Sequence, residues 1–259
     1  MKRLAILSVI ALLAFQQNAL AWANYGHRIV IAVAQRHISG TARQNIAKYI
    51  DYNLQDDATW MDKHRNDKDI AYTTAWHVYK VDENHNYDPN ARLGVEDAIY
   101  ALSLVDYNLS HFRELSDSAV VMNIRMLIHF TGDMHCPGHS YFPGPSCFWK
   151  CRLGDIGNTF HYMYDHMPEW LYEGTPDEVA ARIDDQRKSA IRKIQKGTPV
   201  DWAKQCGDRN AHIYEINAPL TEVLDPDTVE KSRETVSCQL RDAGYRLAFL
   251  IEKYFGKGK

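Results

Sequence analysis

Histidines and aspartates at helical spacing are the residues of this sequence whose arrangement could do chemistry. His129 and Asp133 stand four positions apart at the end of an apolar run, Val120 to Phe130, whose period favours a buried helix. On a helix both side chains project from one face, and Pro137 then ends the helix. Buried ionisable groups need a partner or a metal ion. The pair therefore predicts a buried site where imidazole and carboxylate converge, in preference to a chance cluster on a solvated face.

The same spacing recurs at His161 and Asp165, while Asp62 and His77 each have aromatic neighbours. Taken singly, such residues are more often structural, as a His–Asp hydrogen bond or a core histidine bonded to a backbone carbonyl. Taken together, histidines and carboxylates spread over four segments suit zinc, and they are too numerous for one tetrahedral ion. A cysteine-based zinc site is disfavoured because the sequence has no Cys-x-x-Cys pair. We therefore predict several metal ions.

Helices are expected to position these residues. Apolar periodicity, capping residues and prolines predict an all-α fold, a single compact multi-helix domain with long loops and at most a short β-hairpin. Residues 76–81 alternate and are rich in β-formers, so they form the one extended segment we expect. Residues 136–157 contain Pro and Gly and predict an irregular loop. The expected helices span residues 28–38, 41 to about 49, a short segment after Asp57, 95–115, 118–134, 159–166, 176–196 and 226–255.

The composition fits one exported domain of residues 22–259. The 259 residues are 45% hydrophobic and 24% charged, enough for one large core. Lys2 and Arg3, an apolar stretch at 4–15 and a small-residue site ending at Ala21 predict a signal peptide over residues 1–21. The stretch is too short for a membrane helix. We expect the mature protein in a periplasm or outside the cell, without stable membrane association or an obligate protein partner.

The charge balance limits the possible ligands. Removing Lys2 and Arg3 leaves 28 of the 30 basic residues against 33 acidic ones. This chain lacks the basic excess of a strong duplex binder, so any contact with nucleic acid should be short and local.

Five cysteines in an exported chain suggest two disulfides and one remaining thiol. Cys147 with Cys151 could close a small loop, and Cys206 with Cys238 could join two late helices. Cys136 would then be the odd one, although the sequence does not fix the pairing.

Six motifs follow one another between Trp22 and Asp165, within a similarity that extends to about Tyr214. They are Trp22 with Gly26-His27, Trp60-x-Asp62 with Arg65, Trp76-His77, the block from His129 to His139, Gly157-Asn158, and His161-x-x-x-Asp165. In this combination they resemble the zinc-dependent single-strand nucleases and 3′-nucleotidases of the S1/P1 type, which are distantly related to zinc phospholipase C. The match is specific, because every protein ligand of that family's trinuclear zinc centre has a counterpart here in the same order.

The resemblance implies three Zn²⁺ ions. The first ion would be held by Asp62, His77, His129 and Asp133. The second would be held by the free amine and carbonyl of Trp22, by His27 and by Asp133, which would bridge the two ions. The third would be held by His139, His161 and Asp165. An extended or protonated amine is not a ligand, so removal of the signal peptide would be coupled to activation.

The implied chemistry is phosphoester hydrolysis. Two zinc ions bridged by a carboxylate, with Asp62 among their ligands, would hold a hydroxide that attacks phosphorus in line. Arg65 would neutralise the phosphoryl oxygens and Asn158 would donate to them; their alternative roles are a surface salt bridge and a turn residue. The substrates would be single-stranded RNA or DNA, cut to 5′-nucleotides, and 3′-nucleotides, which would lose their 3′-phosphate.

The departures from the family lie around the pocket rather than among the ligands. Val78 stands where the family commonly has an aromatic residue for stacking a base, which puts this substrate contact in doubt. Rings that could replace it are Tyr79, Tyr141, Phe142 and Trp149. Other departures are Cys136 in place of glutamine, Gly138 in place of leucine and Ile156 in place of glycine. His135 has no ligand counterpart, so we expect it to be structural.

Two other functions are compatible with the same residues. One is a zinc phosphodiesterase of the phospholipase C type that acts on another phosphoester. The other is a non-catalytic zinc-binding relative, against which the complete ligand set argues.

Overall fold

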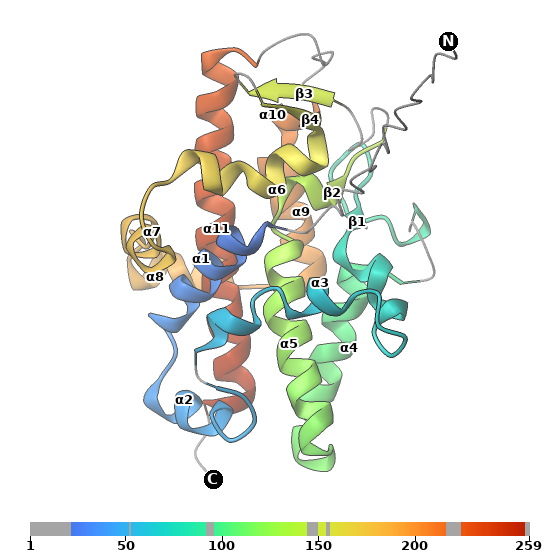
Figure 1. Cartoon of the computed structure of the whole chain (residues 1–259), viewed down its shortest axis with the longest axis vertical. Coiled ribbons are helices and arrows are strands. Elements are labelled where there is room, and N and C mark those ends of the chain that lie inside the picture. The colour runs from blue at the N-terminus through green and yellow to red at the C-terminus, as the bar shows by residue number, and fades with distance from the viewer. Residues whose placement is uncertain are drawn as a thin grey trace, which may run out of the picture.

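Helices make up most of the protein, as a computed structural model shows for residues 22–51, 53–91, 96–143, 150–153, 156–215 and 224–256 (Figure 1). This confirms the predicted all-α class. The α-helices are α1 (Asn24–Gln35), α2 (Gly40–Ile46), α3 (Trp60–His64), α4 (Ala98–Ser110), α5 (Asp117–Asp133), α6 (Phe160–Leu171), α7 (Pro176–Ile183), α8 (Lys188–Gln195), α9 (Pro199–Arg209), α10 (Ala211–Tyr214) and α11 (Pro226–Phe255). Shorter 3₁₀ helices are η1 (Leu54–Asp57), η2 (Ala71–His77), η3 (Pro89–Ala91), η4 (Phe112–Glu114) and η5 (Pro137–His139).

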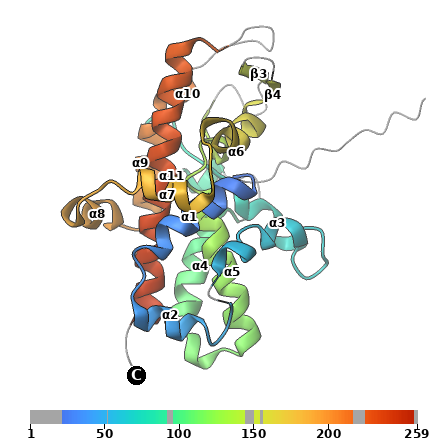
Figure 2. The ribbon, with the colours of Figure 1, turned by 60° about the vertical axis from the view of Figure 1, so that its left-hand side comes forward.

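The core forms where α11 packs on α1 and where α4 packs on α5. In Figures 1 and 2, α11 runs along the length of the molecule, and the α4–α5 pair lies in its lower half. Helix α1 is buried along nearly its whole length, and Gly244 of α11 lets it approach closely. A Cβ at position 244 would lie 2.5 Å from the Cβ of Val33. Each buried Val or Ile on α1 contributes about 1.5–3 kcal/mol by leaving water.

Side-chain caps explain where the helices of the site begin. Ser116 accepts from the backbone N–H of Ala119 at the start of α5, and Thr159 accepts from Tyr162 at the start of α6. Asp97 caps α4 in the same way. Such caps satisfy N–H groups that have no partner inside the helix. They fix which residues of α5 and α6 face the interior.

Two small strand pairs join the helices. Strands β1 (Tyr79–Lys80) and β2 (Ser140–Tyr141) are parallel, with Tyr79 opposite Ser140. Strands β3 (Lys150–Leu153) and β4 (Ile156–Thr159) are antiparallel. Because His77 and His139 come just before the two parallel strands, the pairing brings both histidines to the same end.

Several sequence-based boundaries were wrong. Residues 76–81 are not one extended segment, because η2 continues through His77 and only Tyr79–Lys80 is strand. The single helix expected over 176–196 is two, since α7 ends at a cap on Asp184. The irregular loop expected after Cys136 contains η5, β2, β3 and part of β4 in its described portion. Helices α9 and α10 were not expected, whereas α11 begins and ends as predicted.

The cysteines depart from the expected pairing. Cys136, Cys206 and Cys238 are free thiols, so the pair Cys206–Cys238 is not formed. The thiol of Cys206 instead donates to the Gln239 side chain. The other expected pair, Cys147 with Cys151, falls outside the residues whose side chains the structure describes, as does the predicted signal peptide. Among the described residues, no helix combines the length and apolarity that a membrane span requires.

Candidate metal centre

The C-terminal end of α5 supplies the central pair of the site. Asp133 is fully buried, and its Oδ2 lies 3.3 Å from Nε2 of His129, one helical turn earlier. The Nδ1 atom of His129 lies 2.9 Å from the carbonyl oxygen of Ala58. Because Nδ1–H donates to that carbonyl, Nε2 is left with its lone pair directed into the site.

The first group of possible metal ligands is Asp62, His77 and His129, from α3, the end of η2 and α5. Oδ1 of Asp62 lies 3.7 Å from Nδ1 of His77 and 3.6 Å from Nε2 of His129. The two imidazole nitrogens are 3.1 Å apart. Nδ1 of His77 is also 2.9 Å from Oδ2 of Asp133.

The second group is His27, His129 and Asp133. His27 extends from α1, and its Nε2 lies 3.2 Å from the other oxygen of Asp133, Oδ1. The rings of His27 and His129 stack with centroids 4.3 Å apart. Gly132 makes this approach possible, because a Cβ there would lie 2.5 Å from Nδ1 of His27. Asp133 thus offers one oxygen to each group, which is the position of a bridging carboxylate.

The third group lies between η5 and α6. Nε2 of His139 is 3.2 Å from Oδ1 of Asp165, and Nε2 of His161 is 3.1 Å from Oδ2. Nδ1 of His139 is 2.6 Å from the carbonyl oxygen of His77, so Nε2 faces Asp165. Together with His139 and Asp165, the thiol of Cys136 completes a possible metal-binding set.

Unsatisfied buried atoms test whether metal ions fit these groups. Buried polar atoms almost always have a hydrogen-bond partner. Here, Nε2 of His27, Nε2 of His139, Oδ1 of Asp133, both oxygens of Asp62 and Oδ2 of Asp165 have none. Their separations of about 3 to 4 Å resemble the roughly 3.3 Å between ligand atoms of a tetrahedral ion bound at about 2.0–2.1 Å. The donor set and its spacing therefore fit zinc.

The electrostatics of the metal-free groups are strongly perturbed. Burial opposes protonation of His129, but the carboxylates of Asp133 and Asp62 outweigh it and raise its pKa to about 9. Burial raises the pKa of Asp133 well above its usual value, and the nearby carboxylate of Asp62 adds to the rise. Burial also tends to raise the pKa of Asp165, but the imidazoles of His161 and His139 lower it to about 2. A divalent cation would relieve the crowding of carboxylates.

Trp22 lies next to the third group. Its indole is fully buried, and the N–H of Ala23 donates to the carbonyl of Asp165 at 2.9 Å. Gly26 gives the ring room, because a Cβ there would lie 3.1 Å from the Cβ of Trp22. The backbone at the predicted start of the mature chain therefore runs along the buried end of α6.

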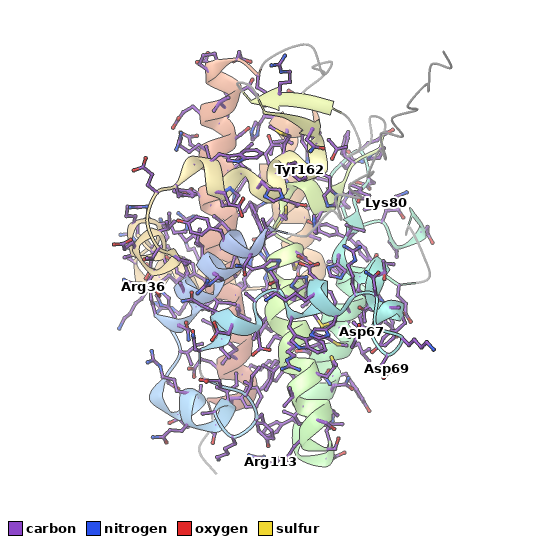
Figure 3. All side chains as sticks on the ribbon, viewed as in Figure 1. Arg36, Asp67, Asp69, Lys80, Arg113 and Tyr162 are labelled. Carbon is purple, nitrogen blue, oxygen red and sulfur yellow. The ribbon has the colours of Figure 1, made fainter. Side chains whose placement is uncertain are left out.

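The residues predicted to contact substrate, Arg65, Asn158 and Val78, differ from one another in burial and in their contacts. Arg65, just after α3, is half-buried, and its charge is among the causes, after burial and two histidines, that lower the pKa of His77. Asn158 lies in β4, where its side chain accepts from the N–H of Thr159 at 2.8 Å. Val78 is 8% exposed, so it offers little surface to a substrate. The chain after Arg65 continues to exposed Asp67 and Asp69 on one side of the molecule (Figure 3).

The aromatic residues suggested as replacements for the base-stacking ring differ in burial and in their contacts. Tyr79 is buried, and its hydroxyl donates to the carbonyl of Met134, so it is not available as a platform. Tyr141 is half-buried and its hydroxyl lies 3.3 Å from Nδ1 of His161. Phe142 is half-buried and stacks on Tyr214 with centroids 4.5 Å apart. Trp149 is outside the described residues.

Two features were missed by reasoning from sequence. The sequence predicts Cys136 only as an unpaired thiol, although Cys136-x-x-His139 has the short spacing of many metal-ligand pairs. Arg246 of α11 is also buried, and its Nη1 lies 2.6 Å from Nε2 of His135. His135 bonds through Nδ1 to the carbonyl of Thr131, which agrees with the structural role expected for it. No periodicity signal distinguishes Arg246 from the surface arginines of α11.

Comparisons with known proteins agree with this geometry. A family model described as S1/P1 nuclease matches residues 22–256. The chain is similar to nuclease P1 of Penicillium citrinum, with 22% identity over 91% of this chain and 98% of the relative. It is also similar to nuclease PA3 of a Penicillium species, with 23% identity over the same shares.

Proposed function

Because the chain belongs to the S1/P1 nuclease family, we propose that it is a zinc-dependent nuclease for single-stranded RNA or DNA that also removes 3′-phosphates from nucleotides. The coarser function, hydrolysis of phosphoester bonds in nucleic acid, follows from the family. The observation that supports the finer one is the position of Asp133. One of its oxygens faces His27 and the other faces His77 and His129, as two neighbouring ions require.

In this proposal three groups of residues hold zinc. Asp62, His77, His129 and Asp133 hold one ion; Trp22 and His27, with Asp133, hold a second; and His139, His161 and Asp165 hold a third. When bound, these ions supply Lewis-acid chemistry, which activates water near neutral pH and stabilises negative charge on a phosphoester.

The side chains around the ions position and desolvate them. The carbonyls of Ala58 and His77 accept from the Nδ1–H groups of His129 and His139, so the Nε2 atom of each ring keeps its lone pair for a metal. The ligand residues are buried or nearly so, which keeps competing water away and strengthens electrostatic interactions within the site. This preorganisation is the chain's own contribution to catalysis.

Arg65 and Asn158 are assigned to the phosphoryl group. Arg65 follows Asp62 by three residues at the end of α3, and its charge contributes, after burial and two histidines, to the lowered pKa of His77. Both observations support a position near the first metal group. A guanidinium there would offer paired N–H donors to phosphoryl oxygens. Asn158 keeps its amide oxygen on the backbone of Thr159, so its NH₂ group is oriented and is the part assigned to the substrate.

Export is part of the proposal because of Trp22. A ligand amine at this residue exists only after cleavage of residues 1–21, so the protein would gain its second metal after translocation to a periplasm or the medium. The hydrogen bond from the N–H of Ala23 to the carbonyl of Asp165 supports this, because it holds the residue after Trp22 beside the metal groups.

The test combines metal analysis with a substrate panel. Mature protein beginning at Trp22 is analysed for zinc and assayed on single-stranded RNA, duplex RNA, a 3′-mononucleotide and phosphatidylcholine. We expect about three zinc ions and hydrolysis of the single strand and the mononucleotide only. Asp67→Asn, which removes an exposed aspartate bonded to His64 near α3, is the control and should behave as wild type.

Other outcomes would redirect the proposal. Cleavage of phosphatidylcholine with no action on RNA would favour a phospholipase-like phosphodiesterase. Full zinc content without hydrolysis of any phosphoester would make the protein a non-catalytic relative.

A further inference from the structure

The third metal group contains one donor more than the proposed function assigns to it. The thiol of Cys136 is fully buried and lies 3.2 Å from Oδ1 of Asp165. The same oxygen is 3.2 Å from Nε2 of His139. Sulfur, nitrogen and oxygen thus face one point, and their ligand atoms all lie within 4.8 Å of one another.

The local backbone is shaped to bring these atoms together. Pro137 starts the single turn of η5, in which the N–H of His139 donates to the carbonyl of Cys136 at 2.9 Å. Gly138 allows this turn to lie against α6, because a Cβ there would be 3.0 Å from the carbonyl oxygen of His161. A side chain at 138 would therefore require η5 or the start of α6 to shift.

Unsatisfied buried atoms of the third metal group also indicate that a ligand binds there. Nε2 of His139 and Oδ2 of Asp165 are buried without a hydrogen-bond partner. Nδ1 of His139 is held by the carbonyl of His77, so the ring cannot turn its unsatisfied nitrogen away. Unsatisfied groups this deep are costly unless a cation occupies the space between them.

We propose that the sulfur of Cys136 is a ligand of the third ion, together with His139 and Asp165. This rests on the proposed metal centre but assigns a donor that the family resemblance does not supply. On binding, the S–H bond breaks, a sulfur–metal bond forms and one proton leaves to solvent. A thiolate makes this group softer than the other two, so it should hold zinc or cadmium in preference to magnesium or manganese.

The test uses cobalt as a spectroscopic probe in the intact mature protein. The metals are replaced by Co²⁺, and the near-ultraviolet absorption is recorded, where thiolate-to-cobalt charge transfer appears. We expect the band in wild type and its loss in Cys136→Ser. Cys206→Ser is the matched control, because Cys206 is also a buried free thiol but bonds to Gln239. It should keep the band.

A second readout measures retention of the ion. We expect Cys136→Ser to lose one zinc of the set to a chelator at a concentration at least about tenfold lower than wild type requires. Cadmium-113 NMR of unmodified protein covers the case in which the serine variant does not fold. There, one of the cadmium resonances should have the strongly deshielded shift of a thiolate-bound ion.

The outcomes separate this inference from the proposed function. Full metal content and RNA hydrolysis without a charge-transfer band or a deshielded cadmium resonance would overturn the thiolate and leave the nuclease intact. A band that survives in Cys136→Ser would overturn it as well. A band lost only in Cys136→Ser, in a protein inactive on every phosphoester, would establish the ligand and refute the nuclease.

Discussion

Two buried polar clusters flank the end of α5, and they differ in how their atoms are satisfied. The metal centre contains His129 and Asp133, whose neighbours include several nitrogen and oxygen atoms without hydrogen-bond partners. The second cluster, which we call the Arg246 cluster, consists of buried His135, Cys206 and Arg246 together with the exposed side chain of Gln205. In it both ring nitrogens of His135 are bonded, one to the carbonyl of Thr131 and one to Arg246.

The contrast shows that residue type alone does not identify a functional site. His129 and His135 are six positions apart, and both are fully buried. The carboxylates around His129 raise its pKa, whereas burial and the charge of Arg246 lower the pKa of His135. Arg246 also donates to the carbonyl of Ile194 and to Gln205. The buried nitrogens of His135 are satisfied within the protein, whereas the His129 cluster keeps unsatisfied buried atoms that a cation could bind.

The largest expected effect comes from removing the bridge of the metal centre. The two oxygens of Asp133 face different groups, and Asp133→Asn replaces one of them with an amide nitrogen, which does not bind zinc. We expect kcat/KM on single-stranded RNA to fall by more than about 10³-fold, with fewer than the wild-type number of zinc ions by elemental analysis. Stability of the metal-free protein should not fall, because a buried charge is removed. An Asp133→Asn protein with full zinc and activity would contradict the bridge.

The next effect concerns the Arg246 cluster. Arg246→Leu leaves Nε2 of buried His135 without its hydrogen-bond partner, which should cost up to about 3 kcal/mol of unfolding free energy. Zinc content and kcat per folded molecule should stay within about twofold of wild type. Denaturant unfolding and elemental analysis measure both.

Arg36→Leu is the matched control for this prediction. It removes a guanidinium paired with Asp184 at the surface, so it should cost no more than about 1 kcal/mol. Loss of zinc from Arg246→Leu while the fold persists would mean that the two clusters are coupled.

A smaller effect is expected when the ions themselves are removed. Ions that bind only the folded state stabilise it by roughly 2.7 kcal/mol when present at 100 times their dissociation constant. We expect a chelator to lower the Tm of wild type and zinc to restore it. Asp133→Asn should respond much less, whereas Arg246→Leu should respond as wild type does. An equal response in all three proteins would show that the chelator acts elsewhere.

Sequence was sufficient for the parts of the molecule in which spacing determines geometry. His129 with Asp133, and His161 with Asp165, are four residues apart on helices, so each pair shares a face wherever the helix lies. The long helix α11 was predicted from Pro226 and the apolar period. The resemblance then ordered the remaining candidate ligands, and the structure brings the histidines and aspartates among them together.

Tertiary contacts decided what sequence did not predict. The segment 76–81 was expected to be extended, but it begins as 3₁₀ helix at Trp76 and His77. It is strand only at Tyr79–Lys80, because its partner after His139 is a strand of just two residues. The helix expected over 176–196 breaks at Asp184, whose side chain pairs with Arg36 and His37. Free thiols replaced the expected Cys206–Cys238 pair. Each outcome depends on residues distant in sequence, which local periodicity does not report.

The smallest expected effect concerns the stacked rings of Phe142 and Tyr214, which lie between the metal centre and the Arg246 cluster. Tyr214 stacks on Phe142, and its hydroxyl lies 2.7 Å from the Ser140 hydroxyl, next to the metal ligand His139. Hydrogen bonding with Asn210 also helps to hold the pKa of Tyr214 down, although burial raises it overall to about 12. Asn210 in turn accepts from Gln239 of α11 at 3.2 Å. The aromatic pair is therefore held through Asn210 to α11, which carries Arg246, and it also contacts Ser140, the residue after the metal ligand His139.

Phe142→Ala should separate binding of the base from the chemistry at the metals. Stacking of one base on a half-buried ring contributes about 1 kcal/mol, so KM for single-stranded RNA should rise about fivefold while kcat and zinc content stay unchanged. Tyr107→Ala, at an exposed ring in α4, is the control and should leave KM unaltered. A fall in kcat with constant KM would instead mean that Phe142 positions β2 and His139. The aromatic pair would then belong with the metal centre and not with its substrate pocket.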